Sequence, residues 1–145
     1  MICRRQSSGG ESTGEIMSIK NEPIKVTAAV IRNGEKVLIC KRPVDKKHGG
    51  LWEFPGGKVE PDETLFDCII RECREELGIT LHPIKIITAI ENGGYEITFI
   101  ECRIVSGELT LNEHKDSRWV SAAGTAELEF CPTDRQALSY IFQNK

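Results

Sequence analysis

The chain has 145 residues, which is enough for one domain with its own hydrophobic core. Hydrophobic residues make up 39% and charged residues 28%, as in ordinary globular proteins, and no apolar run approaches the roughly 20 residues of a membrane span. The net charge of −3 and the pI near 5.7 argue against polymeric nucleic acid as a partner, because such partners require a basic surface.

Residues 1–22 are polar, with glycine and serine clusters and no apolar core of a secretory signal. We expect them to form a disordered extension that precedes a single domain over residues 23–145. Met17 lies shortly before this domain, so translation can start at Met1 or at Met17. The sequence leaves a monomer and a homodimer equally open.

The cysteines show no CxxC pair and no zinc-ligand spacing. They are Cys3, Cys40, Cys68, Cys73, Cys102 and Cys131. We therefore expect reduced, structural thiols and a reducing cytoplasmic location.

Residues 24–32 and 36–42 are rich in β-branched and apolar side chains, and Asn33-Gly34 between them favours a hairpin. Residues 43–50 are polar, basic and glycine-ended, so we expect a mobile loop. An irregular segment over residues 52–60 follows.

A helix is expected from Asp62, whose short acidic side chain can cap the first turn, to the C-terminal Gly78. Its apolar stripe consists of Leu65, Phe66, Ile69, Ile70, Cys73 and Leu77. Glu72, Glu75 and Glu76 lie beside this stripe at i, i+3 and i+4, where like charges destabilise a helix. A cation is expected to bind there, and hard divalent ions such as Mg²⁺ prefer oxygen ligands.

The C-terminal half predicts two more strands, over residues 83–90 and 95–105, joined by a glycine-containing turn. A short strand at 119–120 and a closing helix over 133–142, with Thr133 as its N-cap, complete the chain. These elements suit an α/β fold, an α/β/α sandwich around a mixed sheet.

The segment over residues 57–79 reads GKVEPDETLFDCIIRECREELGI. It resembles the box of the Nudix hydrolase family, G-x5-E-x7-R-E-U-x-E-E-x-G-U, where U is aliphatic. The only departure is Cys73, and buried cysteine behaves as a small hydrophobe. The resemblance implies the Nudix fold and structural roles for Gly57, Glu63, Arg71 and Gly78, with Glu63 and Arg71 paired as an ion pair.

The same resemblance implies a Mg²⁺ site, in which Mn²⁺ can replace Mg²⁺. Its ligands would be the carboxylates of Glu72, Glu75 and Glu76 and the carbonyl oxygen of Gly56. Glu113 matches a glutamate on a late loop of the family, which can also bind the metal. The general base would be Glu72, our first choice, or Glu113, whereas we expect His114 to be a solvated loop residue.

Residues 51–58, LWEFPGGK, are similar to the segment that precedes the box in MutT-type nucleoside triphosphate pyrophosphohydrolases. The expected substrate-binding residues are Arg42, Glu53, Phe54, Pro55, Gly56, Lys58 and Asp134. Arg42 can instead be an exposed charge at a strand end. Asp134 can read a base, since an ionised carboxylate accepts hydrogen bonds from guanine or cytosine, or it can cap the last helix.

The resemblance thus implies a small-molecule nucleotide as the partner and an enzyme that cleaves nucleoside triphosphates to monophosphate and pyrophosphate. Sanitation of oxidised nucleotides such as 8-oxo-dGTP, a DNA-repair role, is the first expectation. A CTP or modified dCTP pyrophosphohydrolase is the second. Dinucleoside polyphosphate hydrolysis is weaker, since Tyr95, which matches it, also suits a strand start. A non-catalytic nucleotide-binding module comes last, because every box glutamate is present.

Overall fold

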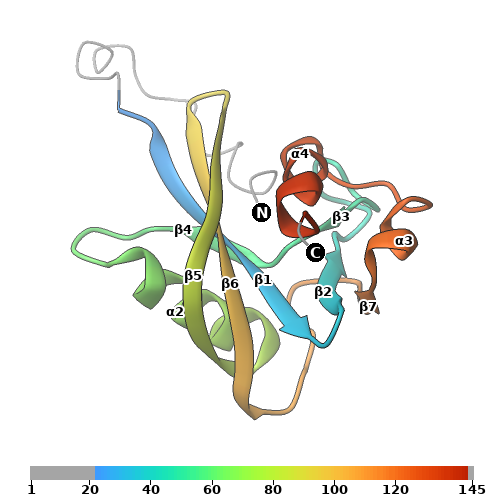
Figure 1. Cartoon of the computed structure of the whole chain (residues 1–145). Helices are drawn as coiled ribbons and strands as arrows, with labels where there is room; N and C mark the ends of the chain where they lie inside the picture. Colours follow the sequence, from blue (N-terminus) through green and yellow to red (C-terminus); the bar gives the residue numbers. More distant parts are fainter. Residues whose placement is uncertain (1–21, 144–145) are drawn as a thin grey trace.

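The computed structural model describes residues 22–143, which form one seven-stranded sheet and three helices (Figure 1). The strands are β1 (Ile24–Asn33), β2 (Lys36–Lys41), β3 (Trp52–Glu53), β4 (Gly56–Lys58), β5 (Ile79–Asn92), β6 (Tyr95–Gly107) and β7 (Asp116–Val120). The helices are α2 (Leu65–Leu77), α3 (Ala122–Thr125) and α4 (Pro132–Ile141).

Strand β1 is the organising strand of the sheet. It runs parallel to β6 on one side, and on its other side it pairs antiparallel with β4 near its start and with β2 near its end. The main strand order is β3-β2-β1-β6-β5, and β7 pairs with β2. The sheet is therefore mixed, as expected, and the short strand β4 is joined directly to its centre.

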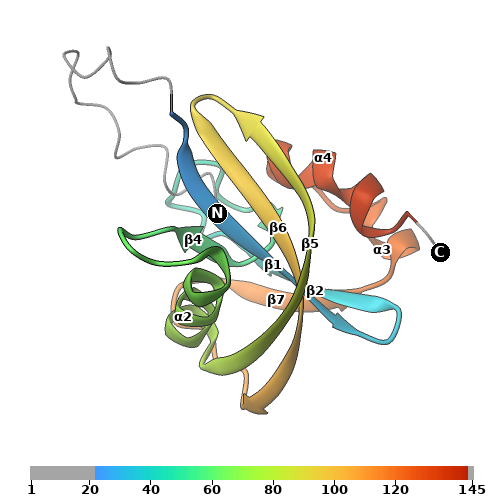
Figure 2. The same ribbon diagram turned by 60° about the vertical axis from the view of Figure 1, so that its left-hand side comes forward.

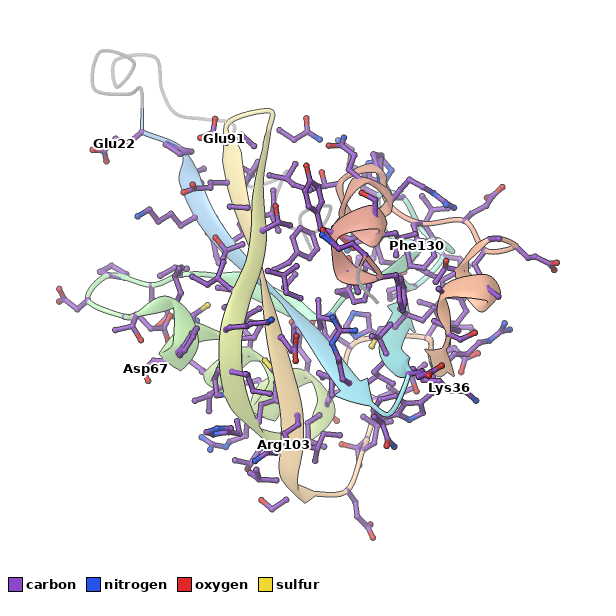
Figure 3. The ribbon with its side chains drawn as sticks, viewed as in Figure 1. Glu22, Lys36, Asp67, Glu91, Arg103 and Phe130 are labelled. Carbon is purple, nitrogen blue, oxygen red and sulfur yellow. The ribbon has the colours of Figure 1, made fainter. Side chains whose placement is uncertain are left out.

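The two main helices lie on opposite faces of this sheet, as two views show (Figures 1 and 2). Helix α2 packs on one face through Ile69, Cys73 and Leu77, and α4 packs on the other through Leu138 and Ile141. Figure 3 labels Asp67 on α2 and Phe130 near α4, on these two sides. The predicted α/β/α sandwich is confirmed.

Both predicted hairpins are present, with one difference in the turn. Strand β1 extends through Asn33, so the two loop residues are Gly34, with φ of 65°, and Glu35. Asn33 itself ends β1 and is not among the residues with positive φ. In the β5–β6 hairpin both loop residues, Gly93 and Gly94, have positive φ, which matches the right-handed twist of a two-residue hairpin.

Helix α2 begins later than predicted. Its N-cap is Thr64, whose hydroxyl accepts a hydrogen bond from the amide of Asp67 at 3.0 Å. Asp62, the predicted first residue, has φ of 67° and lies in the turn before the helix. The predicted end is confirmed, because Gly78 is the left-handed C-cap with φ of 73°.

Helix α4 also starts differently. Cys131 is its N-cap and Pro132 occupies the first turn, where a missing N–H costs nothing. Thr133, the predicted N-cap, instead accepts a hydrogen bond from the Asn92 side chain at 3.0 Å. Strands β5 and β7 are longer than predicted, and residues 52–60 contain two short strands, β3 and β4.

The five described cysteines are all buried thiols, as predicted. Burial raises the pKa of Cys102 to about 12 and holds that of Cys73 well above its ordinary value. Cys3, the expected extension and the choice between Met1 and Met17 lie outside residues 22–143. Within the described part of the chain, none of the helices has the length and apolar character that crossing a membrane requires.

Candidate active site

The segment Pro55-Gly56-Gly57 lies against the first half of β1. The amide of Ala29 donates to the carbonyl of Pro55 at 2.7 Å, and the Thr27 hydroxyl donates to the carbonyl of Gly57 at 3.3 Å. Gly56 has φ of 156°, and a Cβ atom at this position would overlap the carbonyl oxygen of Thr27. Only glycine allows this approach, which fixes the place of the Gly56 backbone.

The first turns of α2 attach to the same segment through Cys68. Its sulfur lies 3.2 Å from the Thr27 hydroxyl and 3.5 Å from the Gly57 carbonyl. Burial raises the pKa of the Cys68 thiol to about 11, so this side chain stays neutral. The glycine segment and the helix that carries the glutamates are therefore held in one fixed arrangement.

Arg71 ties the preceding loop to the glutamates of α2. Its guanidinium donates to both carboxylate oxygens of Glu63, at 2.7 and 3.0 Å, which is the predicted ion pair. It also donates to the Lys58 carbonyl at 3.2 Å and lies 3.1 Å from Glu72 and 3.5 Å from Glu75. Bidentate pairing of this kind fixes orientation as well as charge.

The charges around Arg71 are unbalanced. One guanidinium faces four carboxylates, those of Glu60, Glu63, Glu72 and Glu75. The hydrogen bonds from Arg71 hold the pKa of Glu63 below its ordinary value, and Glu63 in turn raises the pKa of Arg71. The cluster therefore carries an excess of negative charge that a divalent cation would neutralise.

The three candidate metal ligands of α2 differ in exposure. Glu72 and Glu76 are buried, with 5% and 1% of their surface exposed, whereas Glu75 faces solvent. Between residues 22 and 143, no group of three or more ligand side chains is arranged as it stands to hold an ion. Arg71 lies against Glu72 and Glu75, so an ion would require these side chains to reorient. The donor set itself fits a hard cation, because it consists of carboxylate oxygens with surplus negative charge.

Arg42 and Glu53 meet inside the protein. Arg42 is 1% exposed and donates from Nε to the Lys47 carbonyl at 2.9 Å, and its Nη1 lies 3.6 Å from Glu53 Oε1. The alternative for Arg42, an exposed charge at a strand end, is wrong. The basic loop after β2, expected to be mobile, is held by this contact and by the bond from Gly50 N to Arg42 O at 3.0 Å.

His114 belongs to the same buried group. Its Nε2 lies 2.9 Å from Glu53 Oε2, within hydrogen-bonding distance, and neither side chain is exposed. The prediction of a solvated His114 was wrong. Its partner is 61 positions away in the sequence. Glu53 could have indicated this contact from the sequence, because a carboxylate between Trp52 and Phe54 in a buried strand requires a polar partner.

Asp134 is fully buried and joins α4 to the segment after β3. Its Oδ2 accepts a hydrogen bond from the Phe54 amide at 3.0 Å. The N-cap residue of α4, Cys131, makes no side-chain cap hydrogen bond, and Asp134 follows it in the first turn. Lys58 is half-buried at the end of β4, and Glu113 is exposed on the loop between β6 and β7.

The structure thus places the candidate residues in two neighbouring groups. The Arg71 cluster holds the box glutamates next to the Gly56-Gly57 segment. The second group holds Arg42, Glu53 and His114 at the joined ends of β2, β3 and β7. Asn112, which sequence reasoning missed, links them, since its side chain donates to the Glu75 carbonyl at 2.9 Å.

Comparisons with known proteins agree with this arrangement. Residues 22–141 match the NUDIX domain. The chain is 35% identical over 115 residues to a protein named CTP pyrophosphohydrolase from Escherichia coli (strain K12), covering 77% of this chain and 85% of that protein. It is 27% identical over 126 residues to the 8-oxo-dGTP diphosphatase of the same strain, covering 81% and 95%. The solution structure of the E. coli ORF135 protein superimposes with a TM-score of 0.70 at 34% identity, covering 83% and 89%.

Proposed function

The chain belongs to the Nudix family and is a hydrolase of the nucleotide pyrophosphohydrolase type, and we propose that it cleaves nucleoside triphosphates to the monophosphate and pyrophosphate with Mg²⁺. The observation that carries this proposal is the carboxylate face of α2, where Glu72 and Glu76 are buried on a helix that contacts the Gly57 carbonyl through Cys68. Surplus negative charge at the border of a core serves no packing purpose, and it suits a cation that brings in phosphates.

Glu72, Glu75 and Glu76, the Gly56 carbonyl and Glu113 would hold the metal. When bound, it neutralises the phosphates and lowers the pKa of the attacking water. Mn²⁺ offers the same preference for oxygen ligands and can replace Mg²⁺. Cleavage of a phosphoanhydride requires mainly positioning and charge neutralisation, so the fixed backbone around these ligands supports the assignment.

Arg71 and Glu63 act as positioning residues in this proposal. Arg71 reaches Glu72 at 3.1 Å while its other nitrogens are held by Glu63 and the Lys58 carbonyl. Glu72 is thereby oriented, as a general base that accepts the proton of the attacking water must be. Glu113 is the second candidate for the base. The net reaction consumes one water, whose oxygen forms a new P–O bond as one bridging P–O bond breaks, and it yields the monophosphate, pyrophosphate and a proton.

Two classes of base are candidates for the nucleoside. The chain is 35% identical to a CTP pyrophosphohydrolase over 115 residues, and 31% and 27% identical to a putative and a named 8-oxo-dGTP diphosphatase over 117 and 126 residues. We therefore rank CTP and modified dCTP as the first candidate substrates, before the oxidised purine nucleotides that the sequence motifs alone favoured. Asp134 is fully buried, with Oδ2 accepting from the Phe54 amide, and so does not rank the two bases.

Dinucleoside polyphosphate hydrolysis and non-catalytic nucleotide binding have less support. Tyr95, which matched dinucleoside polyphosphate hydrolases, is 5% exposed and packs in the core on the α4 side of the sheet, as an ordinary strand-start aromatic does. A non-catalytic nucleotide-binding module would not need the buried carboxylates of Glu72 and Glu76. Either class of base gives the enzyme a role in controlling the nucleotide pool, and oxidised substrates would add a role in DNA repair.

A screen of the purified protein with normal and modified nucleoside triphosphates, with pyrophosphate detection, tests the proposal. We expect CTP or a 5-substituted dCTP to exceed ATP in kcat/KM by at least about tenfold, the discrimination that one or two buried polar contacts provide. A clear preference for 8-oxo-dGTP would reverse the order of bases. Absence of pyrophosphate release from every triphosphate would refute the proposed reaction.

The variant Glu72→Gln tests the site. It should lower pyrophosphate release by about a thousandfold at saturating Mg²⁺, because it removes a metal ligand and a candidate base. Asp67→Asn is the matched control, since it removes one carboxylate from the exposed first turn of the same helix. Equal turnover in the two variants would exclude Glu72 from the reaction.

A further inference from the structure

Glu113 is exposed, but the residues on either side of it are anchored. It lies on the connection between β6, which ends at Gly107, and β7, which begins at Asp116 (Figure 1). A solvent-facing glutamate on such a loop would ordinarily sample many positions, at a considerable entropic cost on each binding event. Here the chain on both sides is fixed by contacts to different parts of the active site.

The first anchor is Asn112. Its amide donates to the Glu76 carbonyl at 3.0 Å, and its side chain donates to the Glu75 carbonyl at 2.9 Å. Both acceptors belong to residues proposed as metal ligands. Thr110 adds a bond to the Leu77 carbonyl at 2.8 Å. These contacts satisfy carbonyls at the C-terminal end of α2 and fix the loop to the helix.

The second anchor is His114. Its Nε2 bonds Glu53 Oε2 at 2.9 Å, with both side chains fully buried, and Arg42 lies 3.6 Å from the other Glu53 oxygen. The next residue, Lys115, bonds the Lys41 carbonyl at 2.8 Å through its amide. Burying a carboxylate is costly unless it is paired and hydrogen-bonded, so this pair is a strong constraint on the loop.

We propose that Asn112 and His114 are positioning residues that hold Glu113 at the edge of the carboxylate cluster on α2. Consecutive Cα atoms lie about 3.8 Å apart, so fixing both neighbours confines the Glu113 backbone to a small region beside Glu75 and Glu76. The inference rests on the proposed function, in which Glu113 binds the metal or acts as base. It assigns His114 and Asn112 a role through Glu113 and not by contact with substrate.

Pyrophosphate release provides the first test, in a double-mutant cycle with Glu113. His114→Ala should lower kcat by about ten- to a hundredfold, as expected for a misplacement near 1 Å, with a much smaller change in KM. In a Glu113→Ala background the same substitution should cause little further loss. His114→Gln should restore most of kcat, because its amide nitrogen can donate to Glu53 in place of the imidazole. Leu111→Ala, an exposed position of the same loop, is the control.

Hydrogen exchange of the metal-free protein provides a test that does not depend on activity. We expect His114→Ala and Asn112→Ala to accelerate exchange of the amides over residues 110–115 at least tenfold, while β1 amides stay protected. His114→Gln should leave the loop protected. Unchanged exchange in both alanine variants would overturn the proposed anchoring, whether or not the protein hydrolyses nucleotides.

The outcomes separate the two proposals. If the wild type releases no pyrophosphate but the loop exchanges as expected, the proposed function fails and the anchoring stands. If the wild type is active and His114→Ala costs as much in the Glu113→Ala background as in the wild type, the positioning role through Glu113 is wrong. Full activity of His114→Ala beside a strongly impaired Glu113→Ala would overturn it equally.

Discussion

Replacement of Arg71 by alanine is the sharpest test of how the site is held together. The substitution removes the cation that faces Glu60, Glu63, Glu72 and Glu75. It deletes two hydrogen bonds to Glu63, one to Glu72 and one to the Lys58 carbonyl. The carboxylates are then left facing one another, so both lost attraction and new repulsion destabilise the folded state.

The structure sets the expected size of the effect. A hydrogen bond to a charged group contributes about 1.5–3 kcal/mol, and leaving one partner of a buried pair alone costs about 3–5 kcal/mol. Arg71 is 24% and Glu63 12% exposed, so water recovers part of this loss. We expect Arg71→Ala to lower the free energy of unfolding by about 3 kcal/mol. Arg71→Lys should lower the free energy of unfolding by about half as much, because lysine keeps the positive charge but cannot donate two parallel hydrogen bonds to Glu63.

Urea unfolding measures these changes in the free energy of unfolding. EDTA is added so that no divalent ion neutralises the carboxylates in place of Arg71. Arg74→Ala is the matched control, because Arg74 is an exposed arginine of the same helix and should change stability by about 0.5 kcal/mol or less. If Arg71→Ala loses no more stability than Arg74→Ala, the Arg71 cluster does not hold the loop and helix together, and the reasoning is refuted.

Three further predictions concern the glycine segment, acid stability and the thiols. Gly56→Ala should reduce soluble folded protein and unfold at clearly lower urea concentration than wild type, because the new Cβ overlaps the Thr27 carbonyl; an unchanged midpoint would contradict this. Since the folded-state pKa of Glu63 lies below its ordinary 4.5, its pair with Arg71 stabilises fully above that pH and is lost as pH falls through the lower folded value. Glu63→Gln should therefore flatten the fall in stability over that acid range, and a parallel pH curve for the variant would argue against it. In a Cys3→Ser protein, all five remaining thiols should resist alkylation at pH 8 until denaturant is added, and rapid labelling of any of them, followed by mass spectrometry, would show that it is not buried.

Local patterns predicted the elements of this fold well. Apolar periodicity and glycine turns gave both hairpins and the helix that carries the glutamates, and Gly78 marked its end correctly. The start of α2 was missed because Asp62 and Thr64 are both good N-caps, and the choice depends on the turn that brings Glu63 to Arg71. The start of α4 was open to prediction, since Pro132 favours the first helical position.

The site was predictable where it is continuous in sequence and not where it depends on distant contacts. Glu63 and Arg71 are eight residues apart and form the expected pair. His114 and Glu53 come from different parts of the chain, so nothing local distinguishes a buried His114 from a solvated one. Burial of Asp134 against the Phe54 amide likewise depends on how α4 packs on the sheet.

The parallel pairing of β1 with β6 has a consequence for how the protein folds. Ile24 pairs with Tyr95, so the partner strand of β1 lies far along the sequence. Strands β5 and β6, by contrast, form a local hairpin through two glycines. The entropy of closing the long loop must be lost before the contacts between these strands form, so we expect this pairing to be the slow step. We expect the β5–β6 hairpin to form first and β1 to dock afterwards. The Gly56-Gly57 segment attaches to β1, so the active site would be among the last parts of the molecule to form.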